Sequence, residues 1–288
     1  MSGTSVEDLR PGDHACLTFS DSDERLDIVA AFVRDGLRAG EKVVCLTESL
    51  SPSALAEELT SRGFAPQADG TGPLHILGAG EFFVPEGEFD SGRAIGALRA
   101  QIELADRTGY HGLRVTSDMC WALRPFNGAA RLMEYESQLT RILAQENATA
   151  VCQYDRQCFD TVTLATAAEA HGATVAAITY HDDPMLRICR QHVPTGVRVA
   201  GEIDYRAAEP LTRAMTEALA LDDHIDVNLT RLVFLDTVAA GVIVQSAVGL
   251  TSAQRMTVRC AGMPYKILSA LGLRDIAGVT LMAVAHGD

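Results

Sequence analysis

The chain has 288 residues, a formal net charge of −14, 47% hydrophobic residues and 22% charged residues, which is the composition of a globular protein with about two domains. The acidic balance and the absence of a Lys/Arg-rich run argue against nucleic-acid binding. No apolar stretch reaches the ~20 residues of a membrane span, and the polar residues 1–10 do not form a signal peptide. We therefore expect a cytoplasmic protein that binds neither membranes nor nucleic acids.

Strands and helices alternate along the first two-thirds of the chain. The expected strands are residues 14–19, 42–46, 74–77, 113–116, 148–154 and 174–178. The expected helices are residues 26–37, 52–62, 91–108, 129–145 and 161–171. Such alternation predicts a mostly parallel sheet covered by helices on both faces, with ligands beyond the carboxyl ends of the strands.

The loop after the first strand lacks the usual features of a phosphate site. A nucleotide-binding loop would carry Gly-x-x-x-x-Gly-Lys-Ser/Thr between this strand and the next helix. This chain has three carboxylates in residues 20–25, offset by Arg25 alone, and they would repel a triphosphate. We therefore expect neither nucleotide binding nor ATP hydrolysis.

His14 and Cys16 are the first candidate site residues. Positions i and i+2 of a strand face the same way, so the imidazole and the thiol are expected side by side. The pair suits a metal, a thiol–imidazole pair or the polar corner of a small-molecule pocket. The alternative is a core cysteine beside a histidine that is bonded to backbone. The seven cysteines, odd in number and without a Cys-x-x-Cys pair, predict reduced thiols and no structural zinc site.

Further candidates follow two other strands. Asp118 and Trp121 come after the strand at 113–116, and Tyr154, Asp155 and Arg156 lie at or just after the end of the strand at 148–154. Two aromatic rings with a few polar groups are typical of a small-molecule pocket. Core packing for Trp121 and a plain surface pair for Asp155 and Arg156 are the alternatives.

Ordered motifs over about residues 9–184 resemble the MEDS domain, the methanogen/methylotroph DcmR-type sensory domain. The motifs are Gly12-Asp13-His14-x-Cys16-x-x-Phe19, Arg114-Val115-Thr116-x-Asp118-Met119-x-Trp121, Tyr135-Glu136, Cys152-Gln153-Tyr154-Asp155-Arg156 and His171. The resemblance implies a RecA/KaiC-like fold without a Walker motif that senses small molecules such as hydrocarbon derivatives. Phe19, a further ligand-binding candidate, stands where the family usually has Tyr.

The last third of the chain is predicted to form a second, smaller α/β domain. Pro194 and Gly196 mark a short join at residues 190–196, which gives domains of 1–193 and 197–288. Strands are expected at 197–200, from 224 to about 235, at 256–260 and at 279–284. Helices are expected at about 208–219, 238–250 and 264–271.

Asp236 and Thr237 stand where a buried-type strand meets a helix. A hydroxyl at a helix N-terminus is well placed for phosphorylation, because the unpaired N–H groups favour negative charge; the alternative is a simple N-cap. The order of elements resembles the STAS domain of anti-sigma factor antagonists, in which the hydroxyl after the strand-terminal Asp is phosphorylated. The resemblance implies Thr237 as the phosphosite, with Asp236, Glu202 and Asp204 as its switch neighbours.

The two resemblances together imply a signalling protein and not an enzyme. A small-molecule-sensing domain would control a STAS module that binds an anti-sigma factor or a serine/threonine kinase of the partner-switch type. A phosphatase is a further candidate partner, and a homodimer stays open. The alternative is a metal- or thiol-dependent enzyme or redox sensor that uses His14 and Cys16, with the STAS part serving for assembly.

Overall fold

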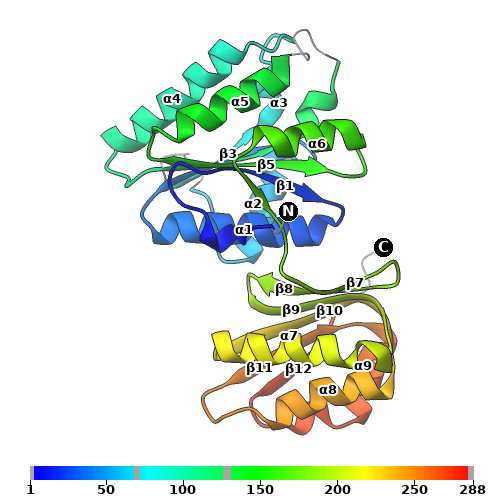
Figure 1. Ribbon diagram of the computed structural model, residues 1–288. Helices are drawn as coiled ribbons and strands as arrows, with labels where there is room; N and C mark the ends of the chain where they lie inside the picture. Colours follow the sequence, from blue (N-terminus) through cyan, green and yellow to red (C-terminus); the bar gives the residue numbers. More distant parts are fainter. Residues whose placement is uncertain (1–2, 68–71, 126–130, 285–288) are drawn as a thin grey trace. The chain divides into compact units, whose positions relative to one another are not determined.

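The computed structural model describes residues 3–67, 72–125 and 131–284. The chain divides into two compact units, Met1–Ala176 and Ala177–Asp288, each with a sheet of its own (Figure 1). No helix in the described part of the chain is long and apolar enough to span a bilayer.

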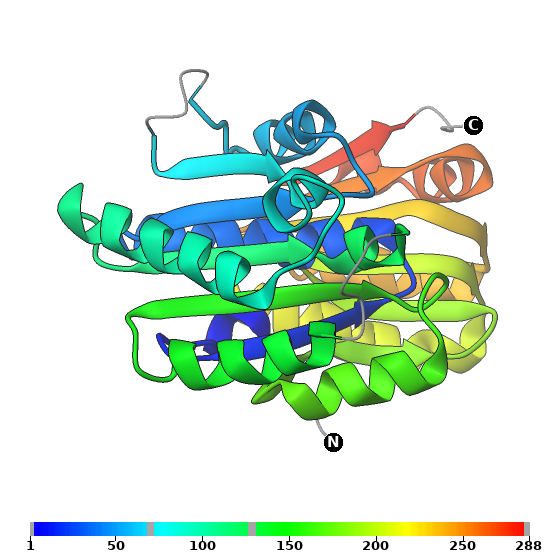
Figure 2. The same ribbon diagram turned by 90° about the horizontal axis from the view of Figure 1, so that it is seen from above.

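The first unit is built on a six-stranded sheet in which every pairing is parallel. Its order is β3-β2-β4-β5-β1-β6, and Figure 2 shows β3, β2, β4, β5 and β1 side by side in this order. The strands are β1 (His14–Phe19), β2 (Lys42–Thr47), β3 (Leu74–Gly78), β4 (Leu113–Asp118), β5 (Ala148–Asp155) and β6 (Ala173–Val175). Strands β2 and β4 are buried throughout, as expected when helices cover both faces. The predicted parallel α/β fold is confirmed.

The helices of this unit form two layers. Figure 1 shows α3 to α6 over one face of the sheet, and α1 and α2 over the other. Asp21, Ser51, Asp90 and Asp160 each accept a backbone N–H at the first turn of a helix. The helices are α1 (Ser22–Arg38), α2 (Pro52–Ser61), α3 (Ala79–Phe83), α4 (Ser91–Arg107), α5 (Leu132–Leu143) and α6 (Thr161–Ala170), with short 3-10 turns at Val6–Asp8 and Met119–Leu123. Residues 129–130 of the predicted helix 129–145 lie outside the described residues.

The second unit has a mixed six-stranded sheet of order β12-β11-β10-β9-β8-β7. The pairs β7–β8 and β8–β9 are antiparallel and the other pairs are parallel. The strands are β7 (Thr179–Asp182), β8 (Leu186–His192), β9 (Thr195–Ile203), β10 (His224–Leu235), β11 (Arg255–Cys260) and β12 (Val279–Ala283). The helices are α7 (Ala208–Leu221), α8 (Thr237–Val248) and α9 (Gly262–Ala270), with 3-10 turns at Tyr205–Ala207 and Leu273–Asp275.

The boundary between the units lies earlier than the predicted join at residues 190–196. That segment is the tight connection between β8 and β9, whose ladder pairs His192 with Thr195. Leu186 and Ile188 of β8 pack in the apolar core of the second unit. The hydrogen bonds and the core thus place β7 and β8 with the second unit, so the domains 1–193 and 197–288 are corrected to 1–176 and 177–288.

Candidate functional site

Four buried polar side chains meet between the sheet and the helices of the first unit. His14 comes from β1, Cys152 from β5 and Glu136 from α5, while His171 follows the last residue of α6. One potential ligand atom from each lies within 4.8 Å of those of the others. We call these four residues the His/Cys/Glu cluster. Since each comes from the body or end of a packed element, the fold holds all four in place.

Distances within the His/Cys/Glu cluster are short. The Nε2 atom of His14 lies 3.4 Å from the Sγ of Cys152 and 3.4 Å from Oε2 of Glu136. The same carboxylate oxygen lies 3.6 Å from Nε2 of His171 and 3.7 Å from Sγ of Cys152. The two imidazole rings lie 4.0 Å apart between centroids. Two nitrogens, one sulfur and one oxygen therefore converge on one small volume.

Hydrogen bonds to neighbouring groups determine which ring nitrogen of each histidine faces Glu136. The Nδ1 of His14 lies 2.7 Å from the hydroxyl of Thr140, which donates its own proton to the carbonyl of Ala170 at 2.8 Å. Thr140 must therefore accept from the N–H at Nδ1 of His14. Similarly, Nδ1 of His171 donates to the carbonyl of Ala167 at 2.6 Å. In the neutral imidazoles, both Nε2 atoms then carry a lone pair toward Glu136.

Glu136 is the anion at the centre of the His/Cys/Glu cluster. Tyr154 donates its hydroxyl to Oε1 of Glu136 at 2.6 Å, which leaves Oε2 to face the two histidines and Cys152. Burial alone would raise the pKa of Glu136, but the contact with His14, the electrostatic interaction with the two histidines and the hydrogen bond from Tyr154 hold the pKa below its ordinary value. Burial lowers the pKa of His171 to about 4. The carboxylate of Glu136 therefore faces a neutral imidazole on His171.

The thiol beside His14 in the structure is that of Cys152 and not the predicted Cys16. His14 and Cys16 belong to one face of β1, and Cys152 is paired with Cys16 across the ladder. Cys16 packs in the apolar core instead, and burial raises the pKa of its thiol to about 12. Burial also raises the pKa of Cys152 well above its ordinary value. Neither thiol has the low pKa that a nucleophile or a redox sensor needs.

A narrow cavity of about 20 Å³ adjoins the His/Cys/Glu cluster. Its wall includes Cys152 itself, the ring of Tyr135 and the ring of Phe83. The lining is largely apolar, and the remaining residues are Val44, Leu46, Phe82, Leu98, Gln101, Val115, Ser117, Leu139, Ala150 and Val151. Among the described residues, Oε1 of Gln101 and Oγ of Ser117 are buried without a hydrogen-bond partner. An apolar cavity with two unmatched polar atoms can hold a very small ligand.

A second polar network lies where β4 ends. The Asp118 carboxylate accepts from Arg25 at 2.9 Å and from both the N–H and the hydroxyl of Ser49, at 2.8 and 2.5 Å. Arg25 also donates to the side chain of Gln153 at 2.6 Å. This buried network ties α1 to β4, to β5 and to the loop after β2. At the start of α1, Asp21 accepts from the N–H of Glu24 at 2.9 Å, so a protein carboxylate occupies the position of a bound anion.

The remaining predicted ligand-binding residues do not gather around one pocket. Trp121 is fully buried and stacks on Phe83 with centroids 4.5 Å apart, so it belongs to the core. Phe19 is buried beneath the guanidinium of Arg25, 5.0 Å from its ring. At the surface, Arg156 donates to the hydroxyl of Thr18 at 2.8 Å. Asp155, half-buried, accepts from the N–H of Gln157 at 2.8 Å.

In the second unit, Asp236 and Thr237 lie where β10 meets α8, as the sequence predicts. One oxygen of Asp236 accepts from the N–H of Ala239 and caps the helix, and the other accepts from the N–H of Tyr205, both at 2.8 Å. Thr237 is the first residue of α8, and its side chain is exposed. The hydroxyl is therefore open to solvent, while its acidic neighbour serves as the cap.

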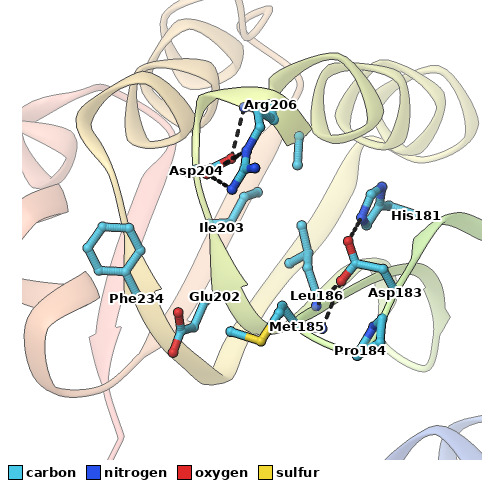
Figure 3. A pocket seen from close by; sticks show the side chains of 11 residues that line it. His181, Asp183, Pro184, Met185, Leu186, Glu202, Ile203, Asp204, Arg206 and Phe234 are labelled. Carbon is cyan, nitrogen blue, oxygen red and sulfur yellow. Dashed lines mark hydrogen bonds and ion pairs between the residues drawn. The ribbon is translucent and has the colours of Figure 1, made fainter.

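A pocket of about 460 Å³ lies beside this turn (Figure 3). Asp204 forms an ion pair with Arg206, and His181 forms one with Asp183. Figure 3 shows the carboxylate of Glu202 beside the ring of Phe234, away from both pairs. The pocket is lined by His181, Asp183, Pro184, Met185, Leu186, Glu202, Ile203, Asp204, Arg206, Ala207 and Phe234. The predicted neighbours Glu202 and Asp204 thus share one pocket wall close to Asp236.

Sequence reasoning did not single out Glu136, His171 or Thr140 as site residues. Glu136 and His171 are among the residues that carry the MEDS resemblance, but nothing in their local pattern relates them to His14. A buried acid on an apolar helix face was the available signal for Glu136, because such a group needs partners.

Comparison with known proteins agrees with the motifs of the first unit. Residues 13–172 match the model of the family described as MEDS, MEthanogen/methylotroph, DcmR Sensory domain. The chain belongs to the MEDS family. The four residues of the His/Cys/Glu cluster lie within the matched region.

A curated relative is the "Transcriptional repressor DcmR" of Methylorubrum extorquens (strain DSM 6343 / CIP 106787 / DM4). It is 23% identical over 168 residues, which are 58% of this chain and 61% of the relative, so the MEDS protein spans less than two-thirds of that protein's length. Family membership indicates a sensory domain in residues 13–172.

Two solved structures are similar to part of the chain. One is the KaiC-like protein PH0186 from Pyrococcus horikoshii OT3, with 14% identity, a TM-score of 0.46, and coverage of 64% of this chain and 79% of that one. The other is the flagellar accessory protein FlaH from Methanocaldococcus jannaschii, with 11% identity, a TM-score of 0.43, and coverage of 68% and 92%. Both scores are below 0.5, so neither structure decides the function of this chain.

Proposed function

We propose that this MEDS protein is a cytoplasmic regulator, not an enzyme, in which the first unit senses a small molecule and the second unit is a STAS-type partner switch. The observation that carries the proposal is the family match of residues 13–172, since that family is described as sensory. The dephosphorylated second unit binds an anti-sigma factor or a partner-switch kinase, and phosphorylation of Thr237 ends that binding.

The first unit offers a cavity of about 20 Å³, which holds a ligand of one or two heavy atoms without rearrangement. The cavity beside Cys152 is apolar, and two buried polar atoms, on Gln101 and Ser117, are available to a ligand within it. Because α4 and α5 supply part of its wall, a ligand that enlarges the cavity would move these helices. Such a movement is a physical basis for sensing.

The second unit supports the switch through the surroundings of Thr237. Phe234, Val238, Tyr205 and Met185 are large apolar side chains with 47%, 52%, 65% and 58% of their surface exposed. Exposed apolar groups of this size mark a surface that a protein partner covers. A phosphate on Thr237 would add about −1.5 to −2 charges to this surface, beside Asp236, and so weaken binding to an acidic partner.

The experiment is to map phosphate on the full chain isolated from its native cells by intact mass and peptide sequencing. We expect one phosphate, on Thr237, and none in the Thr237→Ala variant. Thr216→Ala is the matched control, because Thr216 is an exposed threonine on α7 of the same unit. Phosphate that persists in Thr237→Ala, or that is lost equally in Thr216→Ala, contradicts the proposed switch.

A thiol-dependent enzyme or redox sensor is the less favoured function. Cys16 is buried in the core and its pKa is raised to about 12, so little thiolate forms at neutral pH. The contacts of His14 run to Thr140, Cys152 and Glu136, not to a reactive thiol.

A further inference from the structure

We propose that His14, Glu136, Cys152 and His171 bind one zinc ion through two imidazole nitrogens, one thiolate and one carboxylate oxygen. The inference concerns the interior of the first unit and does not depend on the proposed phosphoswitch. It assigns a role to the four buried side chains that converge between β1, β5, α5 and α6.

Four of the six separations among the ligand atoms match those of a tetrahedral zinc site, and all of the ligand atoms lie within 4.8 Å of one another. Zinc bonds of ~2.0–2.3 Å in tetrahedral geometry separate neighbouring ligand atoms by about 3.3–3.8 Å. From Oε2 of Glu136, the distances to His14, His171 and Cys152 are 3.4, 3.6 and 3.7 Å. The distance from His14 to Cys152 is 3.4 Å. These four separations all fall within the range that the metal requires.

The histidines are oriented as metal ligands are. Each donates its Nδ1–H to an oxygen, of Thr140 for His14 and of the Ala167 carbonyl for His171, so each presents the lone pair of Nε2. The Nε2 of His171 is buried, and no group in the described part of the chain lies within hydrogen-bond distance of it. A lone pair aimed at a carboxylate oxygen is repelled unless a proton or a metal cation lies between the two, and a metal ion can contact all four ligand atoms at once.

Charge also favours a divalent cation. The Glu136 carboxylate and a Cys152 thiolate carry two negative charges, and one Zn²⁺ neutralises both, so the buried site has no net charge. Binding breaks the S–H bond of Cys152, forms the Zn–S bond and releases the proton to solvent. Nitrogen and sulfur ligands in tetrahedral geometry select zinc over magnesium or calcium, which prefer oxygen ligands.

Two further side chains, Tyr154 and Thr140, hold the proposed ligands in position. Tyr154 donates to Oε1 of Glu136, which directs Oε2 to the metal position. Thr140 lies one helical turn after Glu136 on α5 and fixes the ring of His14. Outer-shell groups of this kind orient the ligands of a metal.

The test uses the full chain, produced in zinc-supplemented medium and dialysed against metal-free buffer. Zinc and protein are then quantified by mass spectrometry and amino-acid analysis. We expect one zinc per chain in the wild type and less than a tenth of that in Cys152→Ser. Cobalt loading of the wild type should give thiolate-to-metal charge-transfer absorption, which Cys152→Ser lacks.

Cys16→Ser is the matched control. Cys16 pairs with Cys152 across the β1–β5 ladder and is equally buried, but it is not a ligand of the proposed site. This variant should keep its full zinc content, and Thr140→Val should keep zinc with an affinity about 10-fold weaker. Zinc lost equally from Cys16→Ser and Cys152→Ser overturns the assignment, as does a wild type that retains no zinc or that holds iron instead.

If a variant does not fold, a measurement on the wild-type chain tests the ligand set instead. Zinc-edge X-ray absorption of the intact chain should report one sulfur and three nitrogen or oxygen neighbours. A spectrum without sulfur, or with two or more sulfurs, contradicts the proposed ligand set.

Discussion

Asp118 shows how one buried carboxylate joins four segments of the first unit. It is the last residue of the fully buried strand β4 and receives hydrogen bonds from Arg25 on α1, from Ser49 and from the N–H of Cys120. Burial alone would raise the pKa of Asp118, but the charge of Arg25 and the hydrogen bonds from Ser49 hold the pKa below its ordinary value. A buried charge with several partners is costly to leave unpaired.

We predict that Asp118→Asn lowers the free energy of unfolding by roughly 2–4 kcal/mol at pH 7, because the Arg25 charge loses its buried partner. The folded pKa of Asp118 lies below its unfolded value. Its contribution is therefore present above the ordinary pKa and is lost as the pH falls through the folded pKa. Urea unfolding between pH 7 and pH 3 should show a wild-type advantage that narrows with acidification.

Glu58→Gln is the control for this pair. Glu58 is half exposed and meets Arg62 one turn away on the surface of α2, and such pairs contribute only ~0.3–0.5 kcal/mol. An effect of Asp118→Asn as small as that of Glu58→Gln would show that the buried network does not stabilise the unit.

His14 could be identified from the sequence because a strand places alternate residues on one face, which is a local rule. Its partners could not. Glu136, Cys152 and His171 are 122, 138 and 157 positions away in the sequence. The pairing of β1 with β5 brings Cys152 close to His14, and the packing of α5 and α6 on the sheet brings Glu136 and His171. Local spacing indicates Cys16 as the partner of His14 because it is near along the chain, and the buried ring of Trp121 agrees with the alternative of core packing.

At the scale of the element, the start of α8 depends on Asp236. This carboxylate accepts from the N–H of Ala239 and from the N–H of Tyr205. We predict that Asp236→Ala lowers the free energy of unfolding by about 1–2 kcal/mol, the usual cost of a lost N-cap. Thr237→Ala, at the next and exposed position, should change it by less than about 0.5 kcal/mol. Thermal unfolding measures both, and equal effects would contradict the capping role.

Gly201 allows β9 to pass close to the start of β8. Its φ is +101°, and a Cβ on it would lie 2.0 Å from the carbonyl oxygen of Met185. We predict that Gly201→Ala destabilises the second unit by more than about 2 kcal/mol, since both the backbone conformation and the clash oppose a side chain. Gly241→Ala is the control, because open space surrounds that glycine in α8. Unfolding curves that coincide for the two variants would contradict this reading.

Elements with strong periodicity were predictable, and short polar strands were not. The buried runs of β2, β4 and β5 and the amphipathic helices appear in the sequence as local patterns. Strand β7 lies at the sheet edge with none of its residues fully buried, and its polar residues carry no such pattern. Strand β8 was interpreted in part as a linker because Pro194 and Gly196 follow it. The antiparallel pairing of β8 with β9 across this tight turn places β8 in the sheet.

At the scale of the whole molecule, the boundary after Ala176 makes a direct prediction. A fragment of residues 177–288 keeps all six strands of the second sheet and should unfold cooperatively. A fragment of residues 197–288 lacks β7 and β8, which exposes the edge of β9 and part of the core, and should be unfolded or aggregated. Calorimetry and circular dichroism distinguish them. Equal stability of the two fragments would support the boundary near residue 194 instead.

The central claim is that the first unit controls a switch in the second, and the phosphate occupancy of Thr237 in cells tests it most directly. Occupancy is measured by quantitative peptide mass spectrometry in the wild type, in His14→Ala, and in Cys45→Ser, whose buried thiol lies outside the His/Cys/Glu cluster. We predict a phosphorylated Thr237 in the wild type, a shift of at least several-fold in His14→Ala, and no shift in Cys45→Ser. An unphosphorylated Thr237, or the same occupancy in all three proteins, would contradict the account.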